Sequence, residues 1–560
     1  MDGMTGKLFR EFSLVISGSV IISSFAALTF TPMLATKLLI KREKQNWFYR
    51  KTEPFFEGIN RIYSRSLAAF LKKRWLALPV IAVTIGIIVF LWGYIPAEMA
   101  PLEDRSQISI NTRGAEGVTY EYIRDYTEDI NDLVDSIIPD AESVTARVSS
   151  GSGNVRITLK DMKDRDYSQM DVAEELSKAV QKKTMARSFV QQSSSFGGRR
   201  GGMPIQYVLQ ATNLEKLQEV LPKFMAKVYE NPVFQMADVD LKFSKPEARI
   251  NINRDKASIM GVSTRNIAQT LQYGLSGQRM GYFYMNGKQY EILGEINRQQ
   301  RNKPADLKAI YVRSDKGDMV QLDNLIELTN GIAPPKLYRY NRFASATVSA
   351  GLAEGKTIGQ GLDEMDKIAK ETLDDSFRTA LTGDSKEYRE SSSSLMFAFI
   401  LAIFLIYLIL AAQFESFKDP LIVMLTVPLA IAGALIFMYF GGITMNIFSQ
   451  IGIIMLIGLV AKNGILIVEF ANQKQESGED KMNAIKDASL QRLRPILMTS
   501  ASTILGLIPL AFATSEGCNQ RIAMGTAVVG GMLISTLMTM YIVPAIYSYI
   551  STNRNKLRES

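Results

Sequence analysis

The amino-acid sequence predicts an α-helical membrane protein of about seven transmembrane helices that carries one large extramembrane α+β region. Apolar runs long enough to cross a bilayer, which takes about 20 residues, crowd residues 13–40, 75–95 and the chain after 395. Residues 96–394 instead have the composition of an ordinary soluble domain. The overall 47% of hydrophobic and 21% of charged residues therefore average two different populations.

The residue inventory excludes several kinds of enzyme site. The 560 residues include no histidine and one cysteine, Cys518. A Ser-His-Asp triad, a Cys-His pair and a His-ligated zinc cannot be built within this chain, and neither can an internal disulfide. We expect no enzymatic activity and no cofactor. The net charge of +8 lies largely beside the apolar runs, which indicates membrane topology and not nucleic-acid binding.

The first segments alternate between membrane and surface. Residues 12–39 read as a span, kinked late at Thr31-Pro32, and the run is too long for a signal peptide, so we expect sequence upstream of Met1. Residues 41–74 mix lysine and arginine with aromatics at helical spacing, which predicts a cytoplasmic interfacial amphipathic helix; a solvated linker is the alternative. Residues 75–95 then cross to the far side.

The extramembrane region alternates short strands with helices. Two α+β units of ferredoxin-like rhythm are expected, and a loop rich in Gly, Ser and Arg is expected at 191–203. The first unit has strands at 107–111, 144–148 and 155–159 and helices at 119–138 and 171–182. The second has strands at 205–210, 239–243 and 344–351 and helices at 214–229 and 357–373.

A hairpin-rich module is predicted inside the second α+β unit. Its helix is capped by Ser263 or Thr264. A hairpin over 281–293 turns at Asn286-Gly287, a strong type I′ signal, and another turns near 315–317.

Five further spans are expected at 395–412, 420–440, 451–470, 496–513 and 523–550. The segment 474–494 and the tail are rich in Lys and Arg, which places them in the cytoplasm and the large domain outside. Lys7 and Arg10, before the first span, conflict weakly with this topology.

One span carries a lysine, Lys462, near its centre. A cation at mid-bilayer costs about 2.5–3.5 kcal/mol on insertion scales, so it should face protein or water and have a partner. The alternative, snorkelling along lipid, would have to climb about half of a ~30 Å core. We expect no aspartate in any span, and Glu469 near the end of its own.

Long motifs then point to a family. GLVAKNGILIVEFAN (458–472), RLRPILMTSASTILGLIPLA (492–511), PAEMAPLED (96–104) and AAQFESFKDPLIVMLTVPLAIAGAL (411–435) resemble the resistance-nodulation-cell division (RND) exporters, in particular the hydrophobe/amphiphile multidrug branch that includes the acriflavine-resistance pump. The resemblance covers essentially the whole chain.

The resemblance implies that the chain is the C-terminal half of such a permease. The implied division is the last transmembrane helix of a missing N-terminal half (1–40), the cytoplasmic interfacial helix (41–74), a transmembrane helix (75–95), periplasmic porter subdomains (96–245), a docking module (246–335), the remainder of the second porter subdomain (336–392), five transmembrane helices (393–550) and a cytoplasmic tail (551–560).

The resemblance also implies a mechanism and partners. The family is a homotrimeric proton antiporter of the bacterial inner membrane, driven by the proton-motive force, that exports small amphiphiles through a periplasmic adaptor and an outer-membrane channel. Lys462, Arg492 and Thr499 match its proton-relay positions, with Asn463 a neighbour; Arg492 could instead be a topological flank, and Asn463 a packing residue. Lys462's aspartate partners would lie in the missing half. We expect Gly458, Gly464, Gly506, Gly530 and Gly531 to allow close helix approach.

Substrate handling is expected to depart from the family pattern. The family's drug pocket takes aromatics from a loop where this chain has only SSGSGN. Phe189, Phe196, Tyr207 and Phe234 could line a pocket instead, or pack in cores. An exporter of lipids or other native amphiphiles is the alternative transporter, and a membrane-anchored docking or assembly protein without transport is the alternative of another class. Metal export is disfavoured by the AKN around Lys462.

Overall fold

The computed structural model describes residues 3–38, 47–192, 203–334, 336–353 and 356–552. The chain forms two compact units. One comprises residues 1–113, 121–240 and 339–560, and the other comprises residues 114–120 and 241–338.

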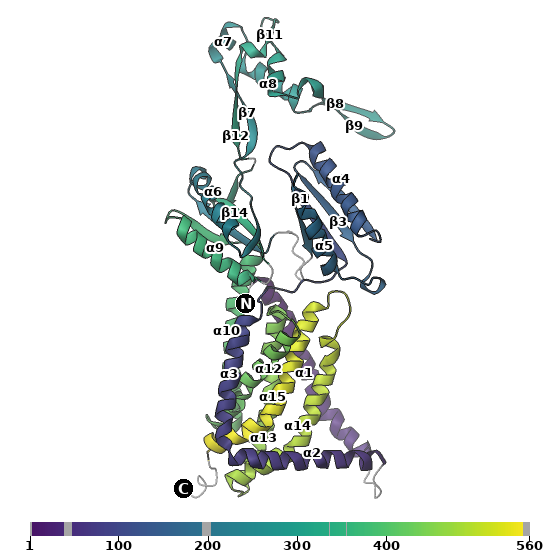
Figure 1. Ribbon diagram of the computed structural model, residues 1–560, viewed down its shortest axis with the longest axis vertical. Helices are drawn as coiled ribbons and strands as arrows, with labels where there is room; N and C mark the ends of the chain where they lie inside the picture. Colours follow the sequence, from purple (N-terminus) through teal and green to yellow (C-terminus); the bar gives the residue numbers. More distant parts are fainter. Residues whose placement is uncertain (1–2, 39–46, 193–202, 335, 354–355, 553–560) are drawn as a thin grey trace. The chain divides into compact units, whose positions relative to one another are not determined.

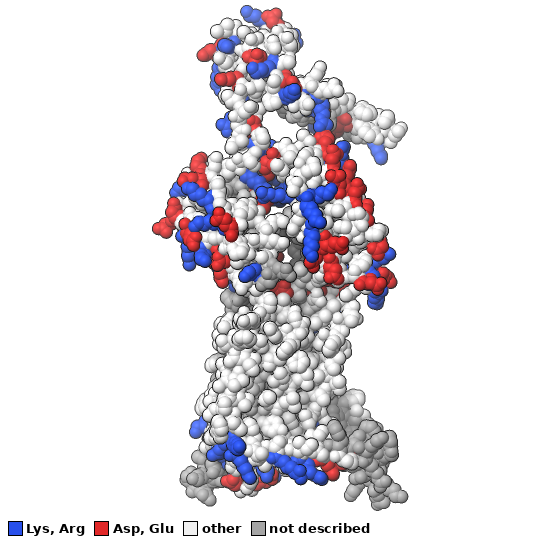
Figure 2. Space-filling view, in the orientation of Figure 1, with Lys and Arg blue, Asp and Glu red and all other residues white. Residues whose placement is uncertain are grey.

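The described part of the chain contains seven helical stretches long and apolar enough to cross a membrane, judged by length and composition. They comprise α1 (Gly3–Leu38), α3 (Ala77–Tyr94), α10 (Gly383–Phe414), α11 (Asp419–Met424) continued by α12 (Thr426–Phe440), α13 (Ile447–Glu476), α14 (Lys481–Ala511) and α15 (Asn519–Ile550). Helix α1 continues through Pro32 and does not end there. On the face shown in Figure 2, the helix bundle between its two ends carries almost no charged side chains.

Helices α12, α13 and α15 form the buried centre of this bundle. Close to two thirds of the residues in the most apolar stretch of each of these helices are buried, whereas the apolar stretches of α1, α3, α10 and α14 are largely exposed. Gly464, Gly530 and Gly531 lie at the expected close approaches, because a Cβ at any of them would press on a neighbouring helix. Gly458 and Gly506 have no described neighbour within 4 Å of a Cβ, so no described helix approaches them closely.

Helix α2 (Trp47–Lys72) contacts α14 and α15. The Tyr63 hydroxyl donates to the Met540 carbonyl at 2.6 Å. That carbonyl has no intrahelical donor, since residue 544, four positions on, is a proline inside α15 and has no N–H. Arg494 pairs with Glu53 at 3.3 Å and lies over the Phe56 ring.

The first α+β sheet contains four antiparallel strands in the order β2-β3-β1-β4. The chain order is β1 (Gln107–Arg113), α4 (Tyr120–Ile137), β2 (Ser143–Ser149), β3 (Ser152–Thr158), α5 (Gln169–Gln181) and β4 (Arg187–Gln192). Alternate residues of β1 are buried, as a strand with one covered face requires. Ile110, Ile130 and Leu176 join the sheet, α4 and α5 in one core.

The second sheet repeats this arrangement with residues inserted between its second and third strands. It is built from β5 (Ile205–Ala211), α6 (Leu214–Glu230), β6 (Phe234–Val239), β14 (Phe343–Leu352), α9 (Ile358–Thr372) and β15 (Arg378–Leu381), with β13 (Tyr338–Tyr340) beside β14. Strand β14 pairs with both β5 and β6. The prediction of a strand at 239–243 is wrong, because β6 ends at the residue where that strand was expected to begin.

The inserted residues form most of the second compact unit, in which Figure 1 labels β7, β8, β9, β11 and β12. Strands β7 (Lys245–Ile252) and β12 (Ile326–Ala333) pair to form a two-stranded ribbon. Between them in the chain lie α7 (Arg254–Ile259), α8 (Thr264–Leu275), β8 (Gln278–Met285), β9 (Lys288–Gly294), β10 (Tyr311–Arg313) and β11 (Met319–Gln321). Ser263 caps α8 by accepting from the Asn266 N–H. Asn286 and Gly287 both have positive φ, as the predicted type I′ turn requires.

Candidate functional site

Lys462 lies in the middle of α13, whose start is fixed by Asn446. The Asn446 side chain accepts from the N–H groups of Phe448 and Ser449 at 3.0 Å. The Lys462 side chain is exposed, and it has no hydrogen bond or ion pair with any residue that the structure describes. Gly458, one turn earlier, is exposed as well. This face of α13 is therefore open around a cation.

Asn463 is buried on another face of α13. Its Nδ2 donates to the Ser500 hydroxyl at 3.1 Å and the Thr536 hydroxyl at 3.3 Å. Ser500 and Thr536 are themselves 3.2 Å apart. The residue next to Lys462 thus joins α13, α14 and α15 through a closed set of hydrogen bonds.

Arg492 and Thr499 lie two turns apart on α14. The Arg492 guanidinium is 4.4 Å from the centre of the Phe470 ring of α13. Its Nε is buried and has no hydrogen-bond acceptor among the described residues. The Thr499 hydroxyl donates to the Ile496 carbonyl. Within the described chain, no hydrogen bond links Lys462 to either residue.

A buried carboxylate missed by the sequence analysis lies at one end of the bundle. Asp419, the first residue of α11, is 2% exposed and accepts from Asn472 Nδ2 at 3.2 Å. Tyr547 donates to Asn472 Oδ1 at 2.6 Å. The expectation that no span contains aspartate is wrong, since a candidate span begins at Asp419. Asn472 is ten residues, or about 15 Å, along α13 from Lys462, so this network is separate from it.

Two further aspartates lie within the long helices. Asp384 is in the first turn of α10 and Asp487 in the second turn of α14. Glu469 accepts from Gln473 one turn along α13. None of these carboxylates pairs with Lys462 in the described structure.

The aromatic candidates of the α+β region lie on two different sheets. Phe189 is half-buried on β4. Tyr207 and Phe234 are buried on β5 and β6, and Tyr207 stacks on Phe224 and donates to Asp366 at 2.8 Å. Burial raises the pKa of the Tyr207 hydroxyl above its usual value, so it is a donor at neutral pH. Phe196 lies outside the described residues.

The comparison with known proteins covers almost the entire chain. The sequence model of the AcrB/AcrD/AcrF family matches residues 1–551. An uncharacterized transporter of Haemophilus influenzae is 30% identical over 569 aligned positions, which cover 100% of this chain and 55% of that protein. The chain thus spans about half the length of this curated relative.

Proposed function

Because the chain belongs to the AcrB/AcrD/AcrF family of RND permeases, we propose that it is the C-terminal half of a proton-driven efflux permease of the bacterial inner membrane. It exports hydrophobic or amphiphilic compounds, such as drugs, by proton antiport. The observation that carries this proposal is Lys462, a cation that pairs with none of the described residues and lies midway along a helix long and apolar enough to span a membrane.

The exposed face around Lys462 fits a partner helix from the other half. An intramembrane cation left to lipid costs about 2.5–3.5 kcal/mol on insertion scales, and the open Gly458 leaves room for close approach. A carboxylate placed there would change its protonation state as its contact with Lys462 is made and broken. Each proton that crosses a ~100 mV potential releases about 2.3 kcal/mol, which drives the cycle.

Arg492 and Thr499 extend this site along α14. The buried Nε of Arg492 has no described acceptor, and an unsatisfied buried donor is costly. An acceptor contributed by the other half would satisfy it. We propose Arg492 and Thr499 as relay residues beside Lys462, with Asn463 holding α13 in register.

The two α+β sheets support a porter role. Both have the β-α-β-β-α-β order of ferredoxin-like units, and we propose that they are the periplasmic porter subdomains (96–245 and 336–392). The inserted residues 246–335 are then the docking module. In this proposal the permease works as a homotrimer with a periplasmic adaptor and an outer-membrane channel.

One observation favours a narrower cargo. Strands β2 and β3 pair Ser149 with Ser152, so a two-residue turn stands where the drug branch has an aromatic-rich loop. Lipids or other native amphiphiles are therefore the second candidate substrates.

The test is dye accumulation in cells deprived of their own pumps that express this chain joined to its first half. Lys462→Ala should abolish efflux. Lys474→Ala should leave it intact, because Lys474 lies on the same helix but pairs with Glu479 at 2.6 Å. Efflux by the Lys462→Ala protein, at equal expression, would remove Lys462 from the coupling site. No dye efflux by the parent pump, together with export of labelled lipid, would establish the second candidate.

A further inference from the structure

Two consecutive buried carboxylates, Glu103 and Asp104, connect the helix bundle to the first α+β sheet. Glu103 is 0% exposed and Asp104 is 8% exposed, on a segment where Arg105 next to them is exposed. Burial of two adjacent acidic side chains is rare unless both are bound. Each binds a different part of the fold.

Glu103 holds the start of α15. Its carboxylate accepts from the backbone N–H groups of Asn519 at 3.3 Å and Gln520 at 3.0 Å. The residue at the N-cap of α15, Cys518, makes no side-chain cap hydrogen bond. Glu103 therefore supplies the cap from more than 400 residues away in sequence, with a charge of the sign that a helix N-terminus favours.

Asp104 holds the start of α5. One carboxylate oxygen pairs with Arg165 and the other accepts from the Gln169 N–H at 3.0 Å. The Asp104 carbonyl also accepts from the Gly517 N–H at 3.1 Å, just before α15.

Gln169 and Ser106 complete the junction. The Gln169 side chain donates to the Glu103 carbonyl and accepts from the N–H groups of Arg105 and Gln107. Ser106 has φ 57°, a left-handed conformation that a serine keeps only where its surroundings impose it. Its hydroxyl donates to Glu516 at 2.7 Å.

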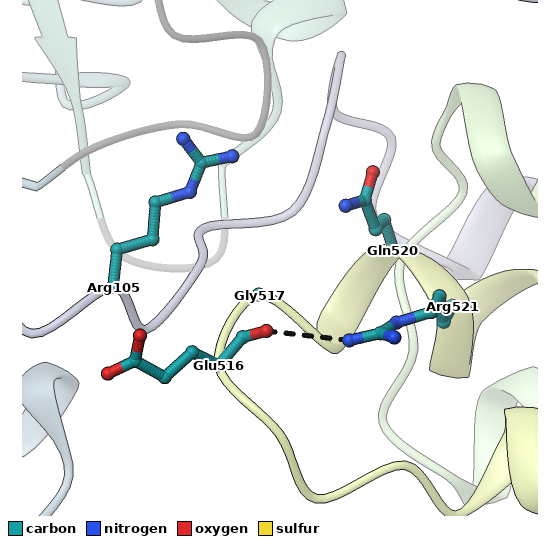
Figure 3. Close-up of a pocket in the computed structure, with 5 residues that line it drawn as sticks. All are labelled: Arg105, Glu516, Gly517, Gln520 and Arg521. Atoms are coloured by element: carbon teal, nitrogen blue, oxygen red, sulfur yellow. Dashed lines mark hydrogen bonds between the residues drawn. The ribbon is translucent and has the colours of Figure 1, made fainter. Parts of the chain in front are cut away.

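The loop before α15 has space beside it. A cavity of about 520 Å³ is lined by Arg105, Glu516, Gly517, Gln520 and Arg521 (Figure 3). The loop is therefore held by hydrogen bonds to Asp104 and Ser106 but is not packed solidly on this side.

Helix α15 also reaches the proposed coupling site. Thr536 lies about five turns from the start of α15. Its hydroxyl accepts a hydrogen bond from Asn463, the residue next to Lys462. A continuous set of contacts thus runs from Asn463 through Thr536 and α15 to Glu103, and through Asp104 to α5 and β1.

We propose that Glu103 and Asp104 are positioning residues that transmit displacement of α15 to the first α+β sheet during transport. This inference rests on the proposed proton-driven function. Because Glu103 binds the N-terminus of α15, a displacement of this rigid helix also moves the segment that carries Glu103 and Asp104. If Glu103 had a purely structural role, its substitution would instead disturb the helix bundle and the α+β sheet to the same extent.

The experiment uses the joined pump in proteoliposomes, with Cys518→Ala as background, because alanine adds no side-chain cap to α15. An environment-sensitive fluorophore is attached at one of two positions: Met185→Cys, an exposed site in the α+β sheet region, or Ser502→Cys, an exposed site on α14. Both probes should respond to a downward pH step on the outer side. Glu103→Gln keeps the side-chain shape but removes the charge at the helix N-terminus. The matched control is Glu142→Gln, an exposed carboxylate in the same α+β unit.

We expect Glu103→Gln to lower the response at position 185 by about 5-fold or more, the low end of typical coupling between sites, and to slow efflux, while the response at position 502 stays intact. Glu142→Gln should change neither. An intact response at position 185 would overturn the proposal, and loss of both responses would show that Glu103 only supports the fold. A parent pump without efflux or response would instead refute the underlying transport function.

Discussion

Asn463 and Thr536 are joined across α13 and α15 by a 3.3 Å hydrogen bond, while the neighbouring Lys462 faces outward. Removal of the Asn463 amide by Asn463→Ala should destabilise the bundle. In a double-mutant cycle with Thr536→Val, we expect a coupling energy of about 0.6 kcal/mol, and at most about 1.7 kcal/mol, the range for hydrogen bonds between membrane helices. Reversible unfolding in mixed micelles measures it. A coupling of zero would mean that the contact contributes nothing to stability.

Tyr63 should support α15 at its proline. The Met540 carbonyl lacks an intrahelical donor because of Pro544 and accepts from Tyr63 instead. Tyr63→Phe should therefore lower the free energy of unfolding by about 1–3 kcal/mol, the cost of an unsatisfied buried polar group. Pro544→Ala restores an N–H to α15 and should recover part of this loss in the Tyr63→Phe background. The measurement is thermal unfolding of the parent, the two single variants Tyr63→Phe and Pro544→Ala, and the double variant. If Tyr63→Phe destabilises the protein equally with and without Pro544, the explanation is refuted.

Glycines in the bundle should divide into two classes. Gly530→Ala places a Cβ against the Phe437 side chain and should cost about 1–3 kcal/mol through overpacking. Gly506→Ala meets no described neighbour and should not destabilise this chain, since alanine is the better helix former by about 1 kcal/mol. Melting temperatures in detergent test the ranking. If Gly506→Ala is as damaging as Gly530→Ala in the isolated chain, the face of α14 is not open.

Glu98 should make stability depend on pH. Burial raises the pKa of this carboxyl above its ordinary 4.5, and the hydrogen bond with Thr444 opposes the change only in part. The folded protein then binds this proton more tightly than the unfolded chain does. The resulting stabilisation is fully present below pH 4.5 and is lost as the pH rises through the raised pKa.

Glu98→Gln isolates this contribution. Relative to the Glu98→Gln protein, the parent should lose stability as the pH rises from 4.5 towards neutrality, whereas the Glu142→Gln control should run parallel to the parent. Chemical unfolding across this pH range is the measurement. Parallel curves for Glu98→Gln would show that Glu98 is not shifted.

Local signals in the sequence were reliable where the structure depends on local chemistry. Asn286-Gly287 predicted its turn because few residues other than Asn and Gly accept positive φ at both positions. The pair Ser263 and Thr264 predicted a helix start, and the structure shows Ser263 as the cap. The long apolar runs predicted where the bundle helices lie but not their ends, because several helices continue beyond the apolar stretch.

Contacts between distant residues were not predictable. Strand β7 pairs with β12 across more than 70 residues. Apolar and polar residues alternate only at the end where Ile250, Ile252 and Ile326 pack on a core. Most of the remaining ribbon is exposed, so the sequence pattern does not identify the pairing. In the sequence, Glu103 is one more charged residue of a linker. Its role depends on Asn519 and Gln520, which lie far away in the sequence. Lys462 could be identified because a mid-span cation is unusual on its own, whereas its partner could not.

The most direct test of the account is proton flux coupled to substrate. The joined pump is reconstituted in vesicles with a pH-sensitive dye inside, and an amphiphilic substrate is added under an imposed proton gradient. We predict substrate-dependent proton movement in the parent and in Lys474→Ala, and none in Lys462→Ala. Equal substrate-dependent proton flux in the Lys462→Ala protein would contradict the central claim that Lys462 couples protons to transport.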